Sequence, residues 1–260
     1  MVNKKILILG ASGFIGRNLA LHFKKKNYNV VGTYFKNKIS LEGVKILKCD
    51  LTKKKETDKV IKGADIVIQA AATTSGAKDI INKPYIHVND NAIINSMVTR
   101  ACYDYKIKHV IVFSCTVMYK SSNKKQKETD FNANEEIYYR YFGAGWTKIF
   151  IEKMCEFYSR LNQNKYTLIR HSNIYGPYDK FDLEKSHVLG ASINKVVNNK
   201  KNKVTIWGNG KESRDLLYVS DLVRFVDLAI KNQKNKFELY NVGLGKLISI
   251  NDLVRKIIKF

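Results

Sequence analysis

Three glycines near the amino end are spaced to bind a phosphate group. The loop Gly10, Ala11, Ser12, Gly13, Phe14, Ile15, Gly16 has the pattern G-x-x-G-x-x-G. Its first glycine permits a tight turn, the second lets backbone N–H groups approach a pyrophosphate, and the third lets a helix pack on a strand. The start of that helix adds partial positive charge. The loop therefore predicts a dinucleotide site, the alternative being an ordinary strand–helix turn.

The residues that follow the second expected strand indicate which dinucleotide binds. An NAD site usually places a carboxylate there for the ribose hydroxyls. Residues 17–41 contain no acid, and Lys36 and Lys38 lie just past the strand. A lysine attracts a 2′-phosphate, so we expect NADP(H), with NAD(H) as the alternative. The alternative interpretation is that both lysines simply belong to the general excess of lysine in this sequence.

Two further segments follow expected strands where a dinucleotide would lie. Asp50 and Leu51 can contact the adenine, or Asp50 can cap the next helix. Ala70, Ala71 and Ala72 offer small side chains beside the coenzyme, or simply pack a helix on the strand.

Histidine and cysteine do not form a metal site in this sequence. The five histidines include no pair at metal-ligand spacing with a carboxylate, so we expect no metal. The four cysteines are widely spaced and indicate a reducing compartment. The sequence shows neither a signal peptide nor an apolar run of the ~20 residues that a membrane span needs. We therefore expect a cytoplasmic protein that binds no membrane.

The elements that position these residues alternate between strand and helix. Short apolar runs predict strands at residues 5–10, 30–34, 45–50, 64–72, 109–114 and 166–170, and helical spacing predicts helices over 18–23, 89–105 and 145–161. Such alternation predicts an α/β fold, a Rossmann-type doubly wound parallel sheet with ligands at the carboxyl ends of its strands. The polar stretch 120–136 predicts a surface loop.

After Pro177 the pattern loosens into a small C-terminal region. We expect a helix over 188–198, a short strand at 204–207 and a helix over 215–232. Residues 1–175 and 215–240 are expected to form the dinucleotide-binding domain. Residues 176–214 and 241–260 are expected to form a small substrate-binding region beside it.

The length and composition fit one large domain, or a domain with a small appendage, and give a strong positive charge. The chain has 260 residues with 46 Lys and Arg against 23 Asp and Glu, a formal charge of +23. Lysines occur along nearly every stretch rather than in one patch. We therefore interpret the charge as a solvated surface that attracts anionic ligands, and we expect no nucleic-acid partner.

Several segments together resemble the extended short-chain dehydrogenase/reductase family. They are the glycine loop, Ala70–Ala72, the stretch 113–119 (FSCTVMY), and three segments typical of the GDP-L-fucose synthase branch: 173–181 (NIYGPYDKF), 186–188 (SHV), and 207–210 (WGNG) followed by Arg214 and Asp215. The resemblance covers almost the whole chain. Members usually run some tens of residues longer, so we expect a C-terminal segment to be absent or short.

The resemblance implies a catalytic Ser or Thr with a Tyr-x-x-x-Lys pair. Four-residue spacing places the pair on one face of a helix. Here Lys148 is present, but the tyrosine position holds Ala144. Alanine there is either a substitution made to trap substrate, which we favour, or a natural change that lost the activity or moved the acid elsewhere. Tyr141 lies two turns before Lys148 and is one alternative donor.

The Ser/Thr position, counted back from Tyr119, falls on Cys115 with Thr116 beside it. Either side chain can polarise a substrate carbonyl, while Cys115 can also be a small buried apolar residue. Sugar-nucleotide dehydratases of the family carry Asp-Glu directly after this position. Residues 116–118 are Thr, Val and Met, which disfavours a dehydratase.

The remaining implied positions lie on the substrate side. The resemblance implies that His187 moves protons, Lys195 faces the diphosphate and Ile174 lines the coenzyme. Asn173, Trp207 and Arg214 are expected to contact substrate. The alternatives are a surface histidine and lysine, a turn asparagine, a core tryptophan, and an ion pair of Arg214 with Asp215 or Asp221.

Together these observations predict an NADP(H)-dependent oxidoreductase acting on a nucleotide sugar, impaired by Ala144. The expected reaction is reduction of a 4-keto sugar, with or without epimerisation, and GDP is implied as the nucleotide by the resemblance alone. A C4-epimerase is one alternative, and a catalytically silent nucleotide-binding or partner protein is another. The family also implies a homodimer formed through helices near residues 89–105 and 144–160.

Overall fold

The computed structural model describes residues 4–74, 82–161, 164–183, 186–199, 203–206 and 208–260. Its main feature is a seven-stranded parallel sheet in the order β3-β2-β1-β4-β5-β6-β9. The strands are β1 (Lys5–Leu9), β2 (Asn29–Tyr34), β3 (Lys45–Lys48), β4 (Ile66–Gln69), β5 (His109–Cys115), β6 (Lys165–His171) and β9 (Phe237–Val242). This arrangement confirms the predicted Rossmann-type α/β fold.

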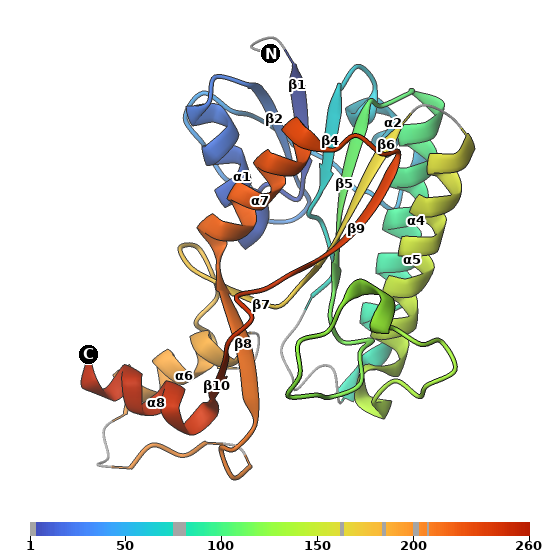
Figure 1. Ribbon diagram of the computed structural model, residues 1–260. Coiled ribbons are helices and arrows are strands. Elements are labelled where there is room, and N and C mark those ends of the chain that lie inside the picture. The colour runs from blue at the N-terminus through green and yellow to red at the C-terminus, as the bar shows by residue number, and fades with distance from the viewer. Residues whose placement is uncertain (1–3, 75–81, 162–163, 184–185, 200–202, 207) are drawn as a thin grey trace.

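Helices cover both faces of this sheet, as Figure 1 shows. They are α1 (Phe14–Lys25) and α7 (Val219–Asn232) on one face, and α2 (Lys54–Ile61), α4 (Asn89–Asp104) and α5 (Phe142–Leu161) on the other. Strand β1 explains the two layers: Ile6 and Ile8 belong to one apolar cluster, and Leu7 and Leu9 to the other. Alternate side chains of a strand point to opposite faces, so an unbroken apolar run fills both layers.

The strand order reverses between β1 and β4, because the chain builds outward from β1 to β3 and then restarts at β4. Ligands of such sheets bind outside the carboxyl ends of the strands at this switch point. The glycine loop follows β1 there, and the alanines 70–72 follow β4.

A smaller three-stranded sheet lies below the carboxyl edge of the large one (Figure 1). It has the order β10-β8-β7, from β7 (Asn173–Tyr175), β8 (Ser213–Tyr218) and β10 (Leu247–Ser249), with α6 (Val188–Val197) and α8 (Ile250–Lys259) beside it. Three short 3-10 helices complete the described elements: η1 (Pro84–His87), η2 (Glu128–Asp130) and η3 (Tyr139–Tyr141).

Two sequence predictions in this region are wrong. Residues 215–218 form the end of β8 rather than the start of a helix, because they pair with β7 and β10, and this pairing overrides the local sequence pattern. Residues 203–206 are irregular rather than a strand, since all three strands of the small sheet come from elsewhere. Trp207 lies outside the described residues.

Candidate functional site

The glycine loop forms an open cradle between β1 and α1. Gly10 adopts a φ of 77°, and its carbonyl accepts a hydrogen bond from the N–H of Gly13 at 2.9 Å. Gly13 precedes α1 and supplies no side-chain cap. The first-turn N–H groups of α1 therefore have no side-chain acceptor, which suits a helix start that receives an anionic ligand.

Close packing explains why the loop needs its first and third glycines. A Cβ on Gly16 would lie 2.3 Å from the carbonyl oxygen of Gly10, and a Cβ on Gly10 would lie 2.8 Å from the backbone nitrogen of Ala71. The segment after β4 thus contacts the loop through backbone atoms, as the small residues 70–72 allow. These features fit a dinucleotide diphosphate, with Ser12 half-buried and Phe14 and Ile15 on the first turn of α1.

The far end of this cradle carries the residues expected near the adenosine. Lys36 and Lys38 are exposed beyond β2, and the ammonium of Lys36 lies 5.7 Å from the centre of the Phe35 ring. Asp50 follows β3, where its carboxylate accepts hydrogen bonds from the N–H and hydroxyl of Thr52. Asp50 therefore shapes the turn before α2 rather than capping it, since residue 53 is the N-cap. Leu51 is buried.

Lys148 of helix α5 lies at the carboxyl edge of the sheet. Its ammonium donates a hydrogen bond to the carbonyl of Phe113 on β5 at 2.9 Å. Ala144 lies half-buried on the first turn of α5, four residues earlier. The structure therefore places residue 144 and the lysine one helical turn apart, with no phenol between them.

Cys115 ends β5 and faces the same region, with Thr116 beside it. Burial raises the pKa of the Cys115 thiol, and the Lys148 ammonium opposes this rise. The thiol is therefore protonated near neutral pH. Tyr141, the alternative donor, packs against the buried cluster Met118, Ile137 and Ile149.

His171 is a site residue that the sequence reasoning missed. It pairs in register with Cys115 across β5 and β6, and its Nδ1 lies 2.8 Å from the carbonyl oxygen of Ser172. Burial lowers the pKa of His171 to about 4, and the charges of Lys148 and His187 contribute. His171 is thus a neutral imidazole among these groups. Its position at the carboxyl end of the buried strand β6 was the signal that could have found it.

The substrate-side residues gather around β7 and α6. Asn173 and Ile174 begin β7, and exposed His187 is the N-cap of α6. The ammonium of Lys195 lies farther along α6 and donates to the carbonyl of Thr205 at 3.1 Å.

Arg214 on β8 donates to the carbonyl of Ser213 at 2.8 Å. The carboxylate of Asp215 instead accepts the N–H groups of Leu244 and Gly245. Within the part of the chain that the structure describes, no ion pair joins Arg214 to Asp215 or Asp221.

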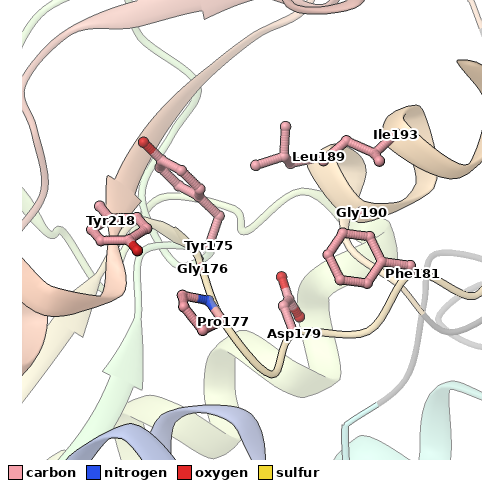
Figure 2. A pocket seen from close by; sticks show the side chains of 9 residues that line it. All are labelled: Tyr175, Gly176, Pro177, Asp179, Phe181, Leu189, Gly190, Ile193 and Tyr218. Atoms are coloured by element: carbon pink, nitrogen blue, oxygen red, sulfur yellow. The ribbon is translucent and has the colours of Figure 1, made fainter. Parts of the chain in front are cut away.

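An apolar cavity of ≈ 310 Å³ lies between β7, β8 and α6. Figure 2 shows Tyr175 and Tyr218 on one side and the α6 side chains Leu189 and Ile193 on another. Phe181 and Asp179 close it from the loop after β7, and burial raises the pKa of Asp179. Leu189, the first residue of α6 that lines the cavity, comes two residues after His187. The cavity is large enough for a small planar group.

The described residues contain neither a membrane-spanning helix nor a metal-binding cluster of side chains. No helix there is long and apolar enough to cross a membrane. No group of three or more His, Cys, Asp or Glu side chains there is arranged to hold a metal ion.

Comparisons with known proteins agree with this geometry. The model of the NAD dependent epimerase/dehydratase family matches residues 6–243. The chain is 29% identical to GDP-L-colitose synthase of Yersinia pseudotuberculosis, over 98% of this chain and 81% of that protein. It is 26% identical to GDP-L-fucose synthase of Azorhizobium caulinodans, over 95% and 77%. The fold matches that of the Thermus thermophilus UDP-glucose 4-epimerase in complex with NAD, with a TM-score of 0.81, 19% identity, and 98% and 82% of the two chains covered.

Proposed function

The chain belongs to the NAD dependent epimerase/dehydratase family, and from this premise we propose that it is an NADP(H)-dependent reductase of a 4-keto nucleotide sugar. The observation that carries the proposal is that Lys148, which bonds to the Phe113 carbonyl of β5, and the uncapped glycine loop after β1 lie at the same carboxyl edge of the sheet. Relatives that synthesise GDP-L-colitose and GDP-L-fucose support a GDP-sugar as the substrate.

The residues of the loop would hold the coenzyme, with its diphosphate on the N–H groups after Gly10 and its adenosine near Asp50 and Leu51. When bound, reduced nicotinamide supplies a hydride to the carbonyl carbon of the sugar, whose oxygen then takes a proton. Lys148 would hold the nicotinamide ribose and favour ionisation of a neighbouring acid. Ile174 would line the coenzyme, with Ala70–Ala72 on its other side.

The protein's own proton chemistry is incomplete at residue 144. Cys115 or Thr116 would hydrogen-bond the sugar oxygen, and His187 would exchange protons at neighbouring carbons if the reaction includes epimerisation. Asn173, Lys195 and Arg214 would bind the sugar and diphosphate, and Trp207 is proposed for the base or sugar. The small lobe built from 176–214 and 241–260 would close the substrate side.

Coenzyme preference depends on Lys36 in this proposal. A Lys36→Glu variant should weaken NADPH binding at least about tenfold while leaving NADH within about threefold, because only NADPH carries the 2′-phosphate. Lys25→Glu is the matched charge control, because this lysine lies at the opposite end of α1 from the glycine loop. Fluorescence titration of both coenzymes measures the difference.

A thermal-shift panel tests the function itself. NADPH and a GDP-4-keto-6-deoxy sugar at about 100 times their dissociation constants should each add about 2.7 kcal/mol of stability. The same panel holds UDP-, CDP- and dTDP-sugars. No shift with any coenzyme or nucleotide sugar would reject the proposal.

Two alternatives have specific support. A C4-epimerase is favoured by the match to a putative UDP-glucose 4-epimerase of Methanocaldococcus jannaschii, 29% identical over 95% of this chain. It would turn over substrate without net NADPH consumption. A silent binding protein is favoured by Ala144 and would show ligand shifts without turnover, even with a tyrosine restored.

We also propose a homodimer in the cytoplasm. The outer faces of α4 and α5 expose large apolar side chains: Ile93 at 42%, Phe150 at 50%, Phe157 at 56% and Leu161 at 49%. Large exposed apolar side chains on two neighbouring helices are costly in water and suit packing against a second copy. The four free cysteines suit a reducing compartment.

A further inference from the structure

A row of three polar residues crosses the carboxyl end of the large sheet. Ser114 on β5 pairs in register with Arg170 on β6, and Arg170 pairs with Asn241 on β9. In-register residues point to the same face, here the one covered by α5. Ser114 and Arg170 are 1% and 3% exposed. A buried guanidinium at this depth needs a partner charge.

Glu152 on α5 provides that charge. Its two carboxylate oxygens accept hydrogen bonds from Nε and Nη2 of Arg170, at 3.0 and 2.7 Å. The hydroxyl of Ser114 donates to the same carboxylate at 2.6 Å. The two charged side chains are 4% and 5% exposed. This bidentate arrangement fixes helix α5 against two strands at once.

The third nitrogen of Arg170 extends the contacts to the surface loop. Its Nη1 donates to the hydroxyl of Tyr119 at 2.6 Å and to the carbonyl of Glu128 at 3.2 Å. The Tyr119 hydroxyl donates in turn to Asn241 at 2.8 Å. The amide side chain of Asn241 donates to the carbonyl of Gln126, and its backbone N–H donates to the Glu128 carboxylate. We call the six residues Ser114, Tyr119, Glu128, Glu152, Arg170 and Asn241 the Arg170 network.

The location of the network is more informative than its contribution to stability. Buried ion pairs often add little stability compared with apolar residues of similar volume. Glu152, however, lies one helical turn after Lys148, and Ser114 lies between Phe113, which accepts the Lys148 hydrogen bond, and Cys115. The network therefore contacts both backbone segments that carry the site.

We propose that Glu152 and Arg170 are positioning residues that set the register of α5 against the end of β5 and hold the 120–136 loop over that edge. Through Glu152 they fix where Lys148 meets the Phe113 carbonyl and how far Cys115 is shielded. Arg170 bonds to Glu128 directly, and through the Tyr119 hydroxyl it also holds Asn241, which bonds to Gln126 and Glu128 of the loop. Their relevance to catalysis rests on the proposed function, but the positioning itself does not.

Two readouts test the positioning without any ligand. Among the cysteines, all of which lie in described segments, Cys115 is half-buried and Cys49, Cys102 and Cys155 are buried, so a thiol reagent such as DTNB reports on the end of β5. The 120–136 loop contains Lys124, Lys125 and Lys127, so trypsin with mass spectrometry reports on its opening. A Cys115→Ala variant identifies the reporting thiol.

Three variants separate positioning from stability. Tyr119→Phe removes one hydroxyl and keeps the ring. The double variant Glu152→Met with Arg170→Met replaces the charges by side chains of similar length. Glu156→Gln is the matched control, because Glu156 is the next glutamate on α5 and pairs with Arg160 and Lys153 at the surface.

Tyr119→Phe should raise tryptic cleavage at residues 124–127 about tenfold, because the hydroxyl that bridges Arg170 and Asn241, the two residues that bond to the loop, is lost. The double variant should raise the DTNB rate of Cys115 about tenfold and weaken NADPH binding, with its melting temperature close to that of the wild type. Glu156→Gln should change none of these. If the double variant fails to fold, the rate of tryptic cleavage in Tyr119→Phe alone tests the proposal.

Unchanged cleavage in Tyr119→Phe, or a folded double variant with wild-type Cys115 reactivity, would overturn the proposal. Failure of the proposed function has a different result. In that case the wild type binds no coenzyme, while the cleavage and thiol rates still respond to the variants.

Discussion

Restoring a tyrosine at residue 144 should produce a large gain in turnover. Ala144 is half-buried on the first turn of α5, and Lys148 is already held 2.9 Å from the Phe113 carbonyl. A phenol there would complete the acid/base pair without new backbone structure. A positioned general acid contributes about 10²–10⁴ in rate, or about 3–5 kcal/mol of barrier. We expect Ala144→Tyr to gain about 10², the lower end of that range, because Cys115 replaces the usual hydroxyl.

The assay is NADPH oxidation with a panel of nucleotide-linked 4-keto-6-deoxy sugars, expressed as kcat/KM. Ala144→Phe is the matched control, because it adds the same ring without the proton. A second control adds Lys148→Met to Ala144→Tyr and should cancel most of the gain. A tyrosine variant no faster than the phenylalanine variant would refute the assignment of residue 144.

Three further predictions concern the glycine loop that would bind coenzyme, the loss of stability at low pH, and the proposed dimer. Gly16→Ala should weaken NADPH binding at least about tenfold (~1.4 kcal/mol), because the added Cβ would lie 2.3 Å from the Gly10 carbonyl oxygen. Gly13→Ala is the control and should lose less affinity, because its Cβ would lie 3.3 Å from the same oxygen. Fluorescence titration with NADPH measures both. Burial lowers the pKa of His109 to about 4, so the folded state resists a proton that the unfolded chain takes near pH 6.5. The contribution of His109 to the free energy of unfolding should therefore be fully present above pH 6.5 and should be lost as the pH falls toward 4. In urea titrations, His109→Gln should reduce the dependence of the unfolding free energy on pH in this range. An unchanged dependence would contradict the assignment. Phe150→Lys with Phe157→Lys should give a monomer in sedimentation, while Leu228→Lys, at an equally exposed leucine of α7, should leave a dimer; a dimer that survives the double change would reject the α4/α5 interface.

The sequence predicted the large sheet well where its strands are buried on both faces. Runs such as 5–10 and 109–114 are apolar without interruption, which is the pattern that two covered faces require. Prediction failed for several half-buried strands, although the half-buried edge strand β3 was predicted. Strand β9 was missed because Phe237–Val242 is partly exposed along its whole length and carries polar residues. β8 was misread because its pairing partners, β7 and β10, lie about 30–40 residues away in sequence, beyond any local pattern.

The residues of the candidate site show the same difference between features that local sequence predicts and features that depend on distant residues. Local spacing was enough to predict the turn of the glycine loop between β1 and α1, because that turn depends on neighbouring residues alone, whereas Lys148 was singled out by the resemblance to a family motif. His171 and Arg170 were missed because their roles come from register across three strands, and the helical spacing of Glu152 gives no hint of a partner on β6. The assignments of Lys36, Asn173, His187, Lys195, Trp207 and Arg214 remain predictions for the ligand experiments above.

The surroundings of residue 144 separate its chemistry from the stability of the fold. Gly145 packs on Ile137 and Met118, and Thr147 bonds back to the carbonyl of Gly143, so the start of α5 is held by its neighbours. Ala144 itself is half-buried and belongs to none of the apolar clusters of the described residues. A side-chain change there should shift the melting temperature little, by the few degrees that surface substitutions cause. If Ala144→Tyr instead altered stability strongly, the residue would belong to the core rather than to the reaction, and the gain in turnover argued above would lose its physical basis.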